Sequence, residues 1–314
     1  MDEQTALVLA IQLVALFSIA GALLLYLICK IRVGFGSEPQ ELSPGAGKPV
    51  LVTCCDNAVG LQIAIHLANR GFRVFAGLKD ISTGEESPDT TSSRIIRSWQ
   101  KHRESISGHQ GALVALPLDV TREDLLHEAV DIIRAHLPAG KDGIWAVINT
   151  SGSVYRGRFD QQDITHWDAV LKTNVVGVLR TARTFQNLLK TASGRIVTIG
   201  AVNPTDSGLV AYTAARYGVE GASKALRTEL APLGIKVITL NPTGLSTDSM
   251  FVTPKFVSKE NTTEISVESN GCLEYYPLVL SESALCTLDV AITVQKPKMS
   301  YDLVKNSFWR TLSI

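Results

Sequence analysis

The sequence has no surplus of charge of either sign. Its 314 residues include 30 Lys and Arg against 30 Asp and Glu, and the isoelectric point is about 7.0. Proteins that bind nucleic acids usually carry an excess of basic residues, so this balance argues against a nucleic-acid partner. The length is sufficient for one large α/β domain with appended segments.

Cysteine and histidine occur without the spacings that a disulfide framework or a metal site requires. An odd number of cysteines at irregular positions argues against both, and buried free thiols are the simpler interpretation. The histidines show no ligand pair of the HExxH kind, so we expect no bound metal. The residues concerned are Cys29, Cys54, Cys55, Cys272 and Cys286, and His66, His102, His109, His127, His136 and His166.

Charged side chains are missing from residues 6–29, where Gln12 is the only strongly polar residue. As a helix this segment would be roughly 36 Å long, enough to cross a hydrocarbon core of about 30 Å. A cleaved signal peptide fits less well, because the apolar run is long and no basic residue precedes it. We therefore expect a transmembrane helix within an anchor that covers residues 1–32.

The charges that flank this span predict its orientation. Asp2 and Glu3 precede it, whereas Lys30 and Arg32 follow it. The positive-inside rule therefore favours a cytosolic position for the rest of the chain, with the endoplasmic reticulum as the default membrane. Asn261 lies in a glycosylation sequon that only a lumenal domain could use.

Residues 49–71 show the pattern of a strand, a tight loop and a helix. The N-terminus of such a helix attracts anions such as a pyrophosphate. Glycine is scarce in the loop, however. A dinucleotide-binding loop normally has three glycines, whereas here Cys54 and Ala58 replace two of them and only Gly60 remains. Taken alone, the loop fits an ordinary strand-to-helix turn as well as a cofactor site.

Strand and helix patterns then alternate along the chain. This alternation is typical of an α/β fold with a doubly wound parallel sheet, Rossmann-like, which we place at residues 49–255. The predicted strands are 50–52, 73–78, 113–118, 145–148, 195–199 and 235–240, and the predicted helices are 59–70, 94–103, a segment around 126–137, 167–189 and a segment around 212–230.

Three other segments are too polar or irregular for this pattern. Residues 33–48 are rich in Gly, Pro, Ser and Glu and predict a flexible linker. Residues 82–93 predict an exposed loop. Residues 256–314 begin with a polar stretch that would either cover the substrate at the carboxyl ends of the strands or form a variable surface excursion; we expect a substrate-covering segment.

Tyr212 and Arg216 are four residues apart on a predicted helix, so their side chains share one face. A cation beside a phenol stabilises the phenolate, which allows a tyrosine to act as a general acid or base near neutral pH. The same spacing also fits a routine contact on the surface of a helix.

In combination, these features resemble the short-chain dehydrogenase/reductase family, in particular its membrane-bound branch of retinol dehydrogenases and 17-beta-hydroxysteroid dehydrogenases. The similarity covers residues 49–247 and is carried by the segments RVFAGL, LDVT, WAVIN, ASGRIV, YTAARYGVEG and GIKV. The resemblance implies NAD- or NADP-dependent oxidation or reduction of a lipidic alcohol or ketone, such as a steroid or retinoid. It also suggests a homodimer.

The resemblance assigns roles to individual residues. Tyr212 would be the catalytic acid or base, Asn174 would organise a water-mediated proton path, and Arg216 stands at the position of the family's catalytic lysine. The cofactor contacts would come from the phosphate loop, from the ends of later strands and from the catalytic helix: Thr53, Cys54, Ala58, Val59, Gly60, Asp119, Asn149, Gly152, Tyr212, Arg216 and Thr247.

Two departures from the family pattern affect the chemistry. Arg216 replaces the lysine of YxxxK; it keeps the charge but is bulkier and does not readily release a proton. Ala201 stands where the family has the serine that polarises the substrate carbonyl, and the loss of one such donor typically costs about 2.7–4 kcal/mol of transition-state stabilisation. Nearby hydroxyls that could substitute belong to Thr198, Thr205 and Ser207.

These departures leave two hypotheses open. The first is a membrane-anchored oxidoreductase, and the second is a pseudoenzyme that keeps the fold in order to bind a ligand or a protein. The choice between NAD and NADP is also open, because Lys79 and Asp80 place one basic and one acidic residue directly after the second strand.

Overall fold

The computed structural model describes residues 16–18, 21, 24, 45, 47–79, 81, 90–104, 111–200, 207–257, 265 and 273–304. The chain divides into two compact units, Met1–Ser43 and Pro44–Ile314. In the first unit, the described residues have a helical backbone. Within the described ranges, no helix is both long and apolar enough to cross a membrane. Most of the predicted anchor and of the predicted linker lies outside these ranges.

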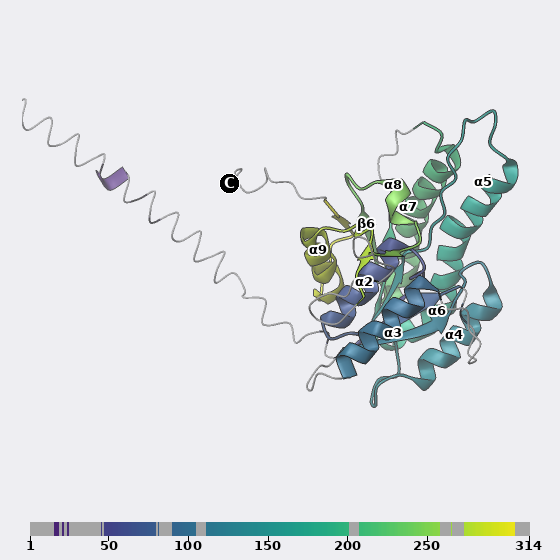
Figure 1. The fold of residues 1–314 in the computed structure, drawn as a ribbon. Coiled ribbons are helices and arrows are strands. Elements are labelled where there is room, and N and C mark those ends of the chain that lie inside the picture. Colours follow the sequence, from purple (N-terminus) through teal and green to yellow (C-terminus); the bar gives the residue numbers. More distant parts are fainter. Residues whose placement is uncertain are drawn as a thin grey trace, which may run out of the picture. The chain divides into compact units, whose positions relative to one another are not determined.

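The second unit is built on a seven-stranded parallel sheet (Figure 1). Its strand order, β3-β2-β1-β4-β5-β6-β9, is that of a doubly wound Rossmann sheet with one further strand at its edge. The predicted fold class is therefore confirmed for this unit. The strands are β1 (Pro49–Val52), β2 (Arg73–Leu78), β3 (Ala112–Pro117), β4 (Ala146–Asn149), β5 (Arg195–Ile199), β6 (Lys236–Asn241) and β9 (Ser300–Asp302).

Helices cover both faces of the sheet, which is why its central strands are nearly continuous apolar runs. Successive side chains of a strand point to opposite faces. Val50 accordingly packs in a core with α2, α3 and α9, whereas Leu51 packs in a second core with α4 and α6. The bounds of these helices are α2 Ala58–Asn69, α3 Thr91–Glu104, α4 Glu123–Ala135, α6 Gly177–Thr191 and α9 Glu282–Thr293.

The predicted helical region 167–189 is helical throughout, but it is not one continuous α-helix. The chain forms α5 (Ile164–Leu171), then a π-helical turn η1 (Lys172–Val176), then α6. The side chain of Asp163 caps α5 by accepting a hydrogen bond from the Thr165 amide. Single π turns inside helices often mark functional sites, and this one contains Asn174.

The helix predicted to carry Tyr212 is α7 (Val210–Leu230) (Figure 1). A 3₁₀ turn, η2 (Ala231–Leu233), continues it, and Gly234 then stops it with a φ of +74°. β6 follows directly and leads to the short helix α8 (Thr247–Met250). The carboxyl end of β6 thus delivers the chain to the ligand-binding edge of the sheet.

Two predicted irregular segments contain regular structure. The predicted loop 82–93 is wrong at its end, because α3 already begins at Thr91. Within residues 256–314, β7 (Lys255–Phe256) and β8 (Tyr275–Tyr276) form a small antiparallel pair, and α9 and β9 join the main domain. The Gln62 side chain ties this part to α2 through hydrogen bonds with the backbone of Val279 and Leu280.

Candidate active site

The candidate site lies where the strand order reverses, between the carboxyl ends of β1 and β4. Ligands of open α/β sheets bind at such a switch point. Residues after β1 and residues after β4 face each other around a chamber of about 140 Å³. Its wall consists of Thr53, Cys54, Lys79, Leu118, Val120, Ser151, Gly152, Ser153, Tyr155, Ala169 and Thr173.

Asn57 fixes the start of α2 against the loop after β4. Its side-chain oxygen accepts a hydrogen bond from the Gly60 amide at 2.7 Å, and its side-chain nitrogen donates to the Thr150 carbonyl at 2.9 Å. The first turn of α2 approaches the preceding loop very closely: a Cβ at Gly60 would lie 1.7 Å from the Cys54 carbonyl oxygen. Packing therefore requires the one glycine that the loop has kept.

Thr150 joins the two loops of the site. Its hydroxyl donates to the Cys54 carbonyl at 3.0 Å and accepts from the Cys54 amide at 3.2 Å. Its own amide donates to the Thr53 hydroxyl at 3.2 Å. These bonds hold Thr53 and Cys54 at the chamber, where the sequence analysis expects them, but they occupy the Cys54 amide within the protein.

Ala58 and Val59 form the buried first turn of α2. The Ala58 amide, one of the donors that a helix N-terminus offers to an anion, donates to the Val252 carbonyl at 2.9 Å. In this conformation the chain itself therefore takes the place of a phosphate oxygen at Ala58.

Cys54 adds a thiol to the phosphate loop, where the family has glycine. Burial of the sulfur raises the pKa of the Cys54 thiol to about 12, and the nearby charge of Asp56 acts in the same direction. The thiol therefore stays neutral at physiological pH and is a poor nucleophile.

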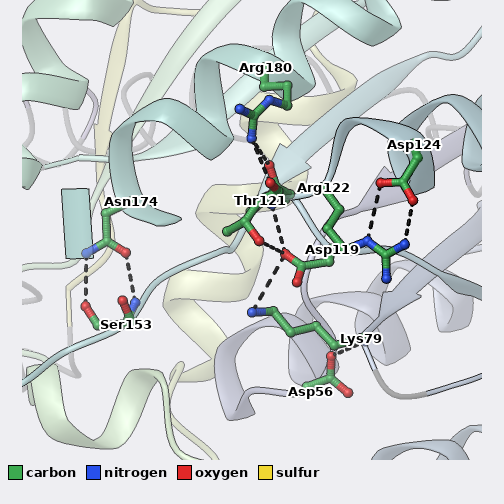
Figure 2. A network of polar contacts seen from close by, with 10 residues as sticks. Asp56, Lys79, Asp119, Thr121, Arg122, Asp124, Ser153, Asn174 and Arg180 are labelled. Carbon is green, nitrogen blue, oxygen red and sulfur yellow. Dashed lines mark hydrogen bonds and ion pairs between the residues drawn. The ribbon is translucent and has the colours of Figure 1, made fainter. Parts of the chain in front are cut away.

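Asp119 lies after β3, next to two residues that line the chamber. One of its carboxylate oxygens accepts hydrogen bonds from the amide and the hydroxyl of Thr121, both at 2.8 Å, and lies 3.8 Å from the ammonium of Lys79 (Figure 2). The Lys79 amide in turn donates to Asp56 at 2.7 Å. The ends of β2 and β3 are thereby linked at the predicted adenine side.

Asn174 is completely buried and faces the backbone of Ser153 (Figure 2). Its side-chain nitrogen donates to the Ser153 carbonyl at 2.9 Å, and its side-chain oxygen accepts from the Ser153 amide at 2.8 Å. Asn174 therefore anchors the loop after β4 with both ends of its amide. The role in a proton path remains a prediction.

Tyr212 and Arg216 occupy the buried face of α7, as their spacing predicts, and each is only 1% exposed. The centre of the Arg216 guanidinium lies 5.0 Å from the centre of the Tyr212 ring, and one of its nitrogens donates to the Ile199 carbonyl at 3.0 Å. The cation thus lies over the face of the phenol ring while it holds the end of β5.

Several buried polar atoms at this end of the sheet have no hydrogen-bond partner among the described residues. Such atoms normally cost free energy, and in native structures they often mark a place where a ligand or water supplies the missing partner. The atoms are both side-chain amide atoms of Asn149, the hydroxyls of Ser151, Ser153 and Tyr212, and Nε and Nη2 of Arg216.

No described hydroxyl clearly replaces the missing serine after β5. The Thr198 hydroxyl lies 3.1 Å from the Ser223 hydroxyl and 3.5 Å from the Ile238 carbonyl, so it is already hydrogen-bonded between β5, α7 and β6. Ser207 is exposed at the entrance to α7. Ala201 and Thr205 lie outside the described residues.

Thr247, the predicted contact to the nicotinamide side, begins α8 and is buried. The residue after this helix, Phe251, reaches further into the site. Its ring centre lies 6.1 Å from that of Tyr212 in an edge-to-face arrangement. Gly152 lies against the same ring, because a Cβ at Gly152 would be 2.2 Å from it.

A larger groove of about 640 Å³ lies on another face of α7, where Val210, Thr213 and Ala214 line it. Their spacing of three and four residues puts them on one side of the helix, whereas Tyr212 points into the core. The groove therefore does not lead to the unpartnered polar atoms.

The family model described as short chain dehydrogenase matches residues 48–255. This range includes every site residue described above. The chain belongs to the short-chain dehydrogenase family. The resemblance of the sequence to this family is thereby confirmed.

Individual relatives agree with the family match. The chain is 30% identical over 227 residues to a mitochondrial D-beta-hydroxybutyrate dehydrogenase from Bos taurus, with 71% of this chain and 61% of the relative covered. It is 29% identical over 241 residues to estradiol 17-beta-dehydrogenase 2 from Rattus norvegicus, with 75% and 58% covered. The chain thus spans about three fifths of the length of these relatives.

A solved structure shows the same fold at lower identity. A gluconate 5-dehydrogenase from Burkholderia cenocepacia, in complex with NADP and tartrate, aligns with a TM-score of 0.53 and 21% identity. The alignment covers 66% of this chain and 76% of that protein. At this identity the comparison supports the sheet and its helices rather than any binding preference.

The unpartnered atoms fit the nucleotide cofactor that the family uses. The hydroxyls and the Arg216 nitrogens are donors suited to ribose oxygens, and the Asn149 amide can both donate and accept. Asn149, Tyr212 and Arg216 are among the residues that the sequence resemblance assigns to the cofactor. What does not fit in this conformation is the space, since the chamber is below the 300–1,000 Å³ typical of small-molecule sites.

Sequence reasoning missed four contributors to this short-chain dehydrogenase site. Thr150 and Asn57 join the loops, Ser151 supplies a buried hydroxyl, and Phe251 covers the catalytic helix. Asn57 carries a sequence signal, because asparagine directly before a helical pattern is a preferred cap. Phe251 carries none, since its contacts come from segments far apart in the chain.

Proposed function

We propose that this protein is an NAD- or NADP-dependent oxidoreductase that interconverts an alcohol and a ketone. The observation that carries the proposal is the buried Tyr212 hydroxyl, which has no hydrogen-bond partner among the described residues and belongs to a group of buried polar atoms at the switch point of the sheet. Burial without a partner is costly unless a ligand compensates. The family match supports the same reaction class.

The residues of this chain would have the following roles in the reaction. A nicotinamide cofactor, when bound, would supply the hydride that reduces the carbonyl carbon of the ketone or take up the hydride from the carbinol carbon of the alcohol. Tyr212 would give a proton to the substrate oxygen or take one from it, while the Arg216 guanidinium lies 5.0 Å from the centre of its ring. Asn174 would keep the loop of Ser151 and Ser153 in place around the reacting groups.

For the substrate we propose a lipidic alcohol or ketone, of steroid or retinoid type. The similarity to an estradiol 17-beta-dehydrogenase supports this class. The uncharged run at residues 6–29 supports it as well, because an anchored enzyme would meet apolar substrates at the bilayer. The similarity to a D-beta-hydroxybutyrate dehydrogenase makes a small hydroxy acid the natural comparison substrate.

Substitution of Tyr212 with Phe tests the proposed chemistry. The change removes only the hydroxyl, so turnover of the best steroid or retinoid substrate should fall by about 10²–10⁴-fold, the usual contribution of a general acid or base. Cofactor affinity should change much less. Unchanged turnover in the Phe variant would contradict the assignment of Tyr212, and calorimetry would show whether the variant still binds cofactor.

A second candidate function is ligand or protein binding by a pseudoenzyme. One specific observation favours it: a nitrogen of Arg216 is bound to the Ile199 carbonyl, so the cation also has a structural task. The absence of a serine at position 201 favours it too. Calorimetric titration with NAD⁺, NADH, NADP⁺ and NADPH separates the two functions, because no binding at millimolar concentration would exclude the oxidoreductase.

We further propose that the protein is a single-pass membrane protein of the endoplasmic reticulum with a cytosolic domain, and that it forms homodimers. The charge pattern at residues 2–32 supports the first proposal. Apolar side chains exposed on η1, α6 and α7, namely Val176, Leu179 and Tyr217, support the second. A glycan on Asn261 would contradict the cytosolic orientation, and a monomer in light scattering would contradict the dimer.

A further inference from the structure

The segment of residues 247–252, which we call the strap, passes over the start of α2. It consists of α8, Phe251 and Val252. Met250 is fully buried and Thr247 nearly so, whereas the Val252 side chain is 40% exposed. The strap is therefore anchored through one side and open to solvent on the other.

The backbone of the strap occupies the donor at the first turn of α2. The Val252 carbonyl oxygen accepts the hydrogen bond of the Ala58 amide at 2.9 Å. Amides at this end of a helix bind phosphate oxygens in dinucleotide sites. A pyrophosphate and the Val252 carbonyl therefore compete for the same donor.

The Phe251 ring occupies the space above the catalytic helix. It contacts Gly152, meets the Tyr212 ring edge to face, and lies 5.1 Å from the centre of the Arg216 guanidinium. Tyr212 and Arg216 carry unpartnered polar atoms at this place. The Arg216 guanidinium thus makes a cation–π contact with the ring, but this contact leaves its Nε and Nη2 without a hydrogen-bond partner among the described residues.

Among the described residues, a chamber on the β2 and β3 side of the site remains open. The chamber there holds about 140 Å³ and ends at Ser151, Gly152 and Ser153. A dinucleotide needs a continuous cleft, and sites for much smaller ligands already measure 300 Å³ or more. The closed strap therefore occupies two positions that a dinucleotide would need, the donor at Ala58 and the space beside Gly152.

Two features of the strap and its surroundings favour movement. Gly244 lies three residues before it, has a φ of +74° and has no atom within 4 Å of the position of a Cβ; glycine is the residue that most readily changes its backbone conformation. On the outer side, Asp248 forms an ion pair with Arg156 at 2.9 Å between two largely exposed side chains. Such a surface pair contributes little to holding the strap closed.

We propose that the strap is a lid, and that NAD(H) or NADP(H) binds only after Phe251 has left Gly152 and the Val252 carbonyl has left the Ala58 amide. The inference rests on the proposed function, because it concerns the cofactor of that reaction. The closed lid lowers the apparent affinity for the dinucleotide by the fraction of molecules that are open. Phe251 determines that fraction.

The test is calorimetric titration of the full-length chain with the four dinucleotides, in the wild type and in Phe251→Ala. If about one molecule in ten is open, the Ala variant should bind its preferred dinucleotide about tenfold more tightly. Val252→Ala is the matched control, because it removes an exposed side chain and keeps the carbonyl that binds Ala58; its affinity should equal that of the wild type. Phe251→Leu keeps an apolar side chain in the core and provides a variant that folds if Phe251→Ala does not.

The outcomes separate the lid from the function. Tighter binding in Phe251→Ala or Phe251→Leu, with no change in Val252→Ala, supports the lid. Equal binding by the wild type and folded Phe251 variants would overturn the lid and leave the proposed function intact. Binding by none of the proteins would overturn the proposed function and the lid with it.

Discussion

Substitution of Asn174 with Ala would remove two partly buried hydrogen bonds at once. The amide of Asn174 binds both the carbonyl and the amide of Ser153, at 2.9 and 2.8 Å, and the Asn174 side chain has no exposed surface. An unsatisfied buried backbone group costs about 1–3 kcal/mol. Since Ser153 is only partly buried, we expect the free energy of unfolding to fall by about 2–4 kcal/mol in total. The midpoint of thermal unfolding should fall by roughly 5–10 °C.

Urea unfolding followed by circular dichroism would measure this loss. Asn187→Ala provides the matched control, because Asn187 is exposed on α6 and the same substitution there should change stability by less than about 0.5 kcal/mol. Asn174→Asp should be at least as unstable as Asn174→Ala, because it places a carboxylate oxygen against the Ser153 carbonyl. A wild-type unfolding free energy in Asn174→Ala, together with slow turnover, would refute the anchoring role and favour the proton path.

Two further substitutions test the phosphate loop. Gly60→Ala should lower the free energy of unfolding by about 3 kcal/mol or more, because its Cβ would lie 1.7 Å from a carbonyl oxygen. Gly221→Ala is the control: it has open space around it and should stabilise α7 by roughly 0.5–1 kcal/mol. Urea unfolding measures both. Because folding raises the pKa of the Cys54 thiol from 9.0 to about 12, its contribution to stability is present below pH 9 and is lost as the pH rises towards 12. Cys54→Ala should therefore lose less stability between pH 8 and 11 than the wild type, and equal losses of stability in the two proteins would contradict the raised pKa of Cys54. In a separate test, iodoacetamide at pH 8 should modify exposed Cys286 before Cys54.

The sheet could be predicted because its signal is local. Strands covered on both faces must be apolar along their whole length, and this pattern placed β2 and β5 at their observed bounds and β1, β3, β4 and β6 within one residue. The helix that carries Tyr212 was predicted from its sequence pattern in the same way, and it ends at Leu230 as expected. The polar residues between these elements could be placed at one edge of the sheet, because the carboxyl ends of parallel strands meet there.

The remaining features depend on contacts between distant segments. The π turn exists where Asn174 binds Ser153, and nothing in the local sequence 172–176 interrupts a helix. α9 carries short apolar side chains in an amphipathic pattern, yet its burial follows from docking on α2, to which Asp289 is bound through His66 and Arg70. Local propensity contains no information on these partners.

Arg216 and the strap affect different properties of the protein, turnover and cofactor binding, and this difference helps to separate the two candidate functions. A guanidinium that binds the Ile199 carbonyl and covers one ring face keeps further N–H groups for a ligand, because arginine has five donors in a fixed plane. The substitution of lysine therefore does not by itself remove cofactor binding; it removes a group that could pass on a proton. The strap has the opposite effect, since it blocks the space and leaves the chemistry of Tyr212 unchanged. A defect of binding thus points to Phe251, and a defect of turnover at saturating cofactor points to the two replaced catalytic positions, Arg216 and Ala201.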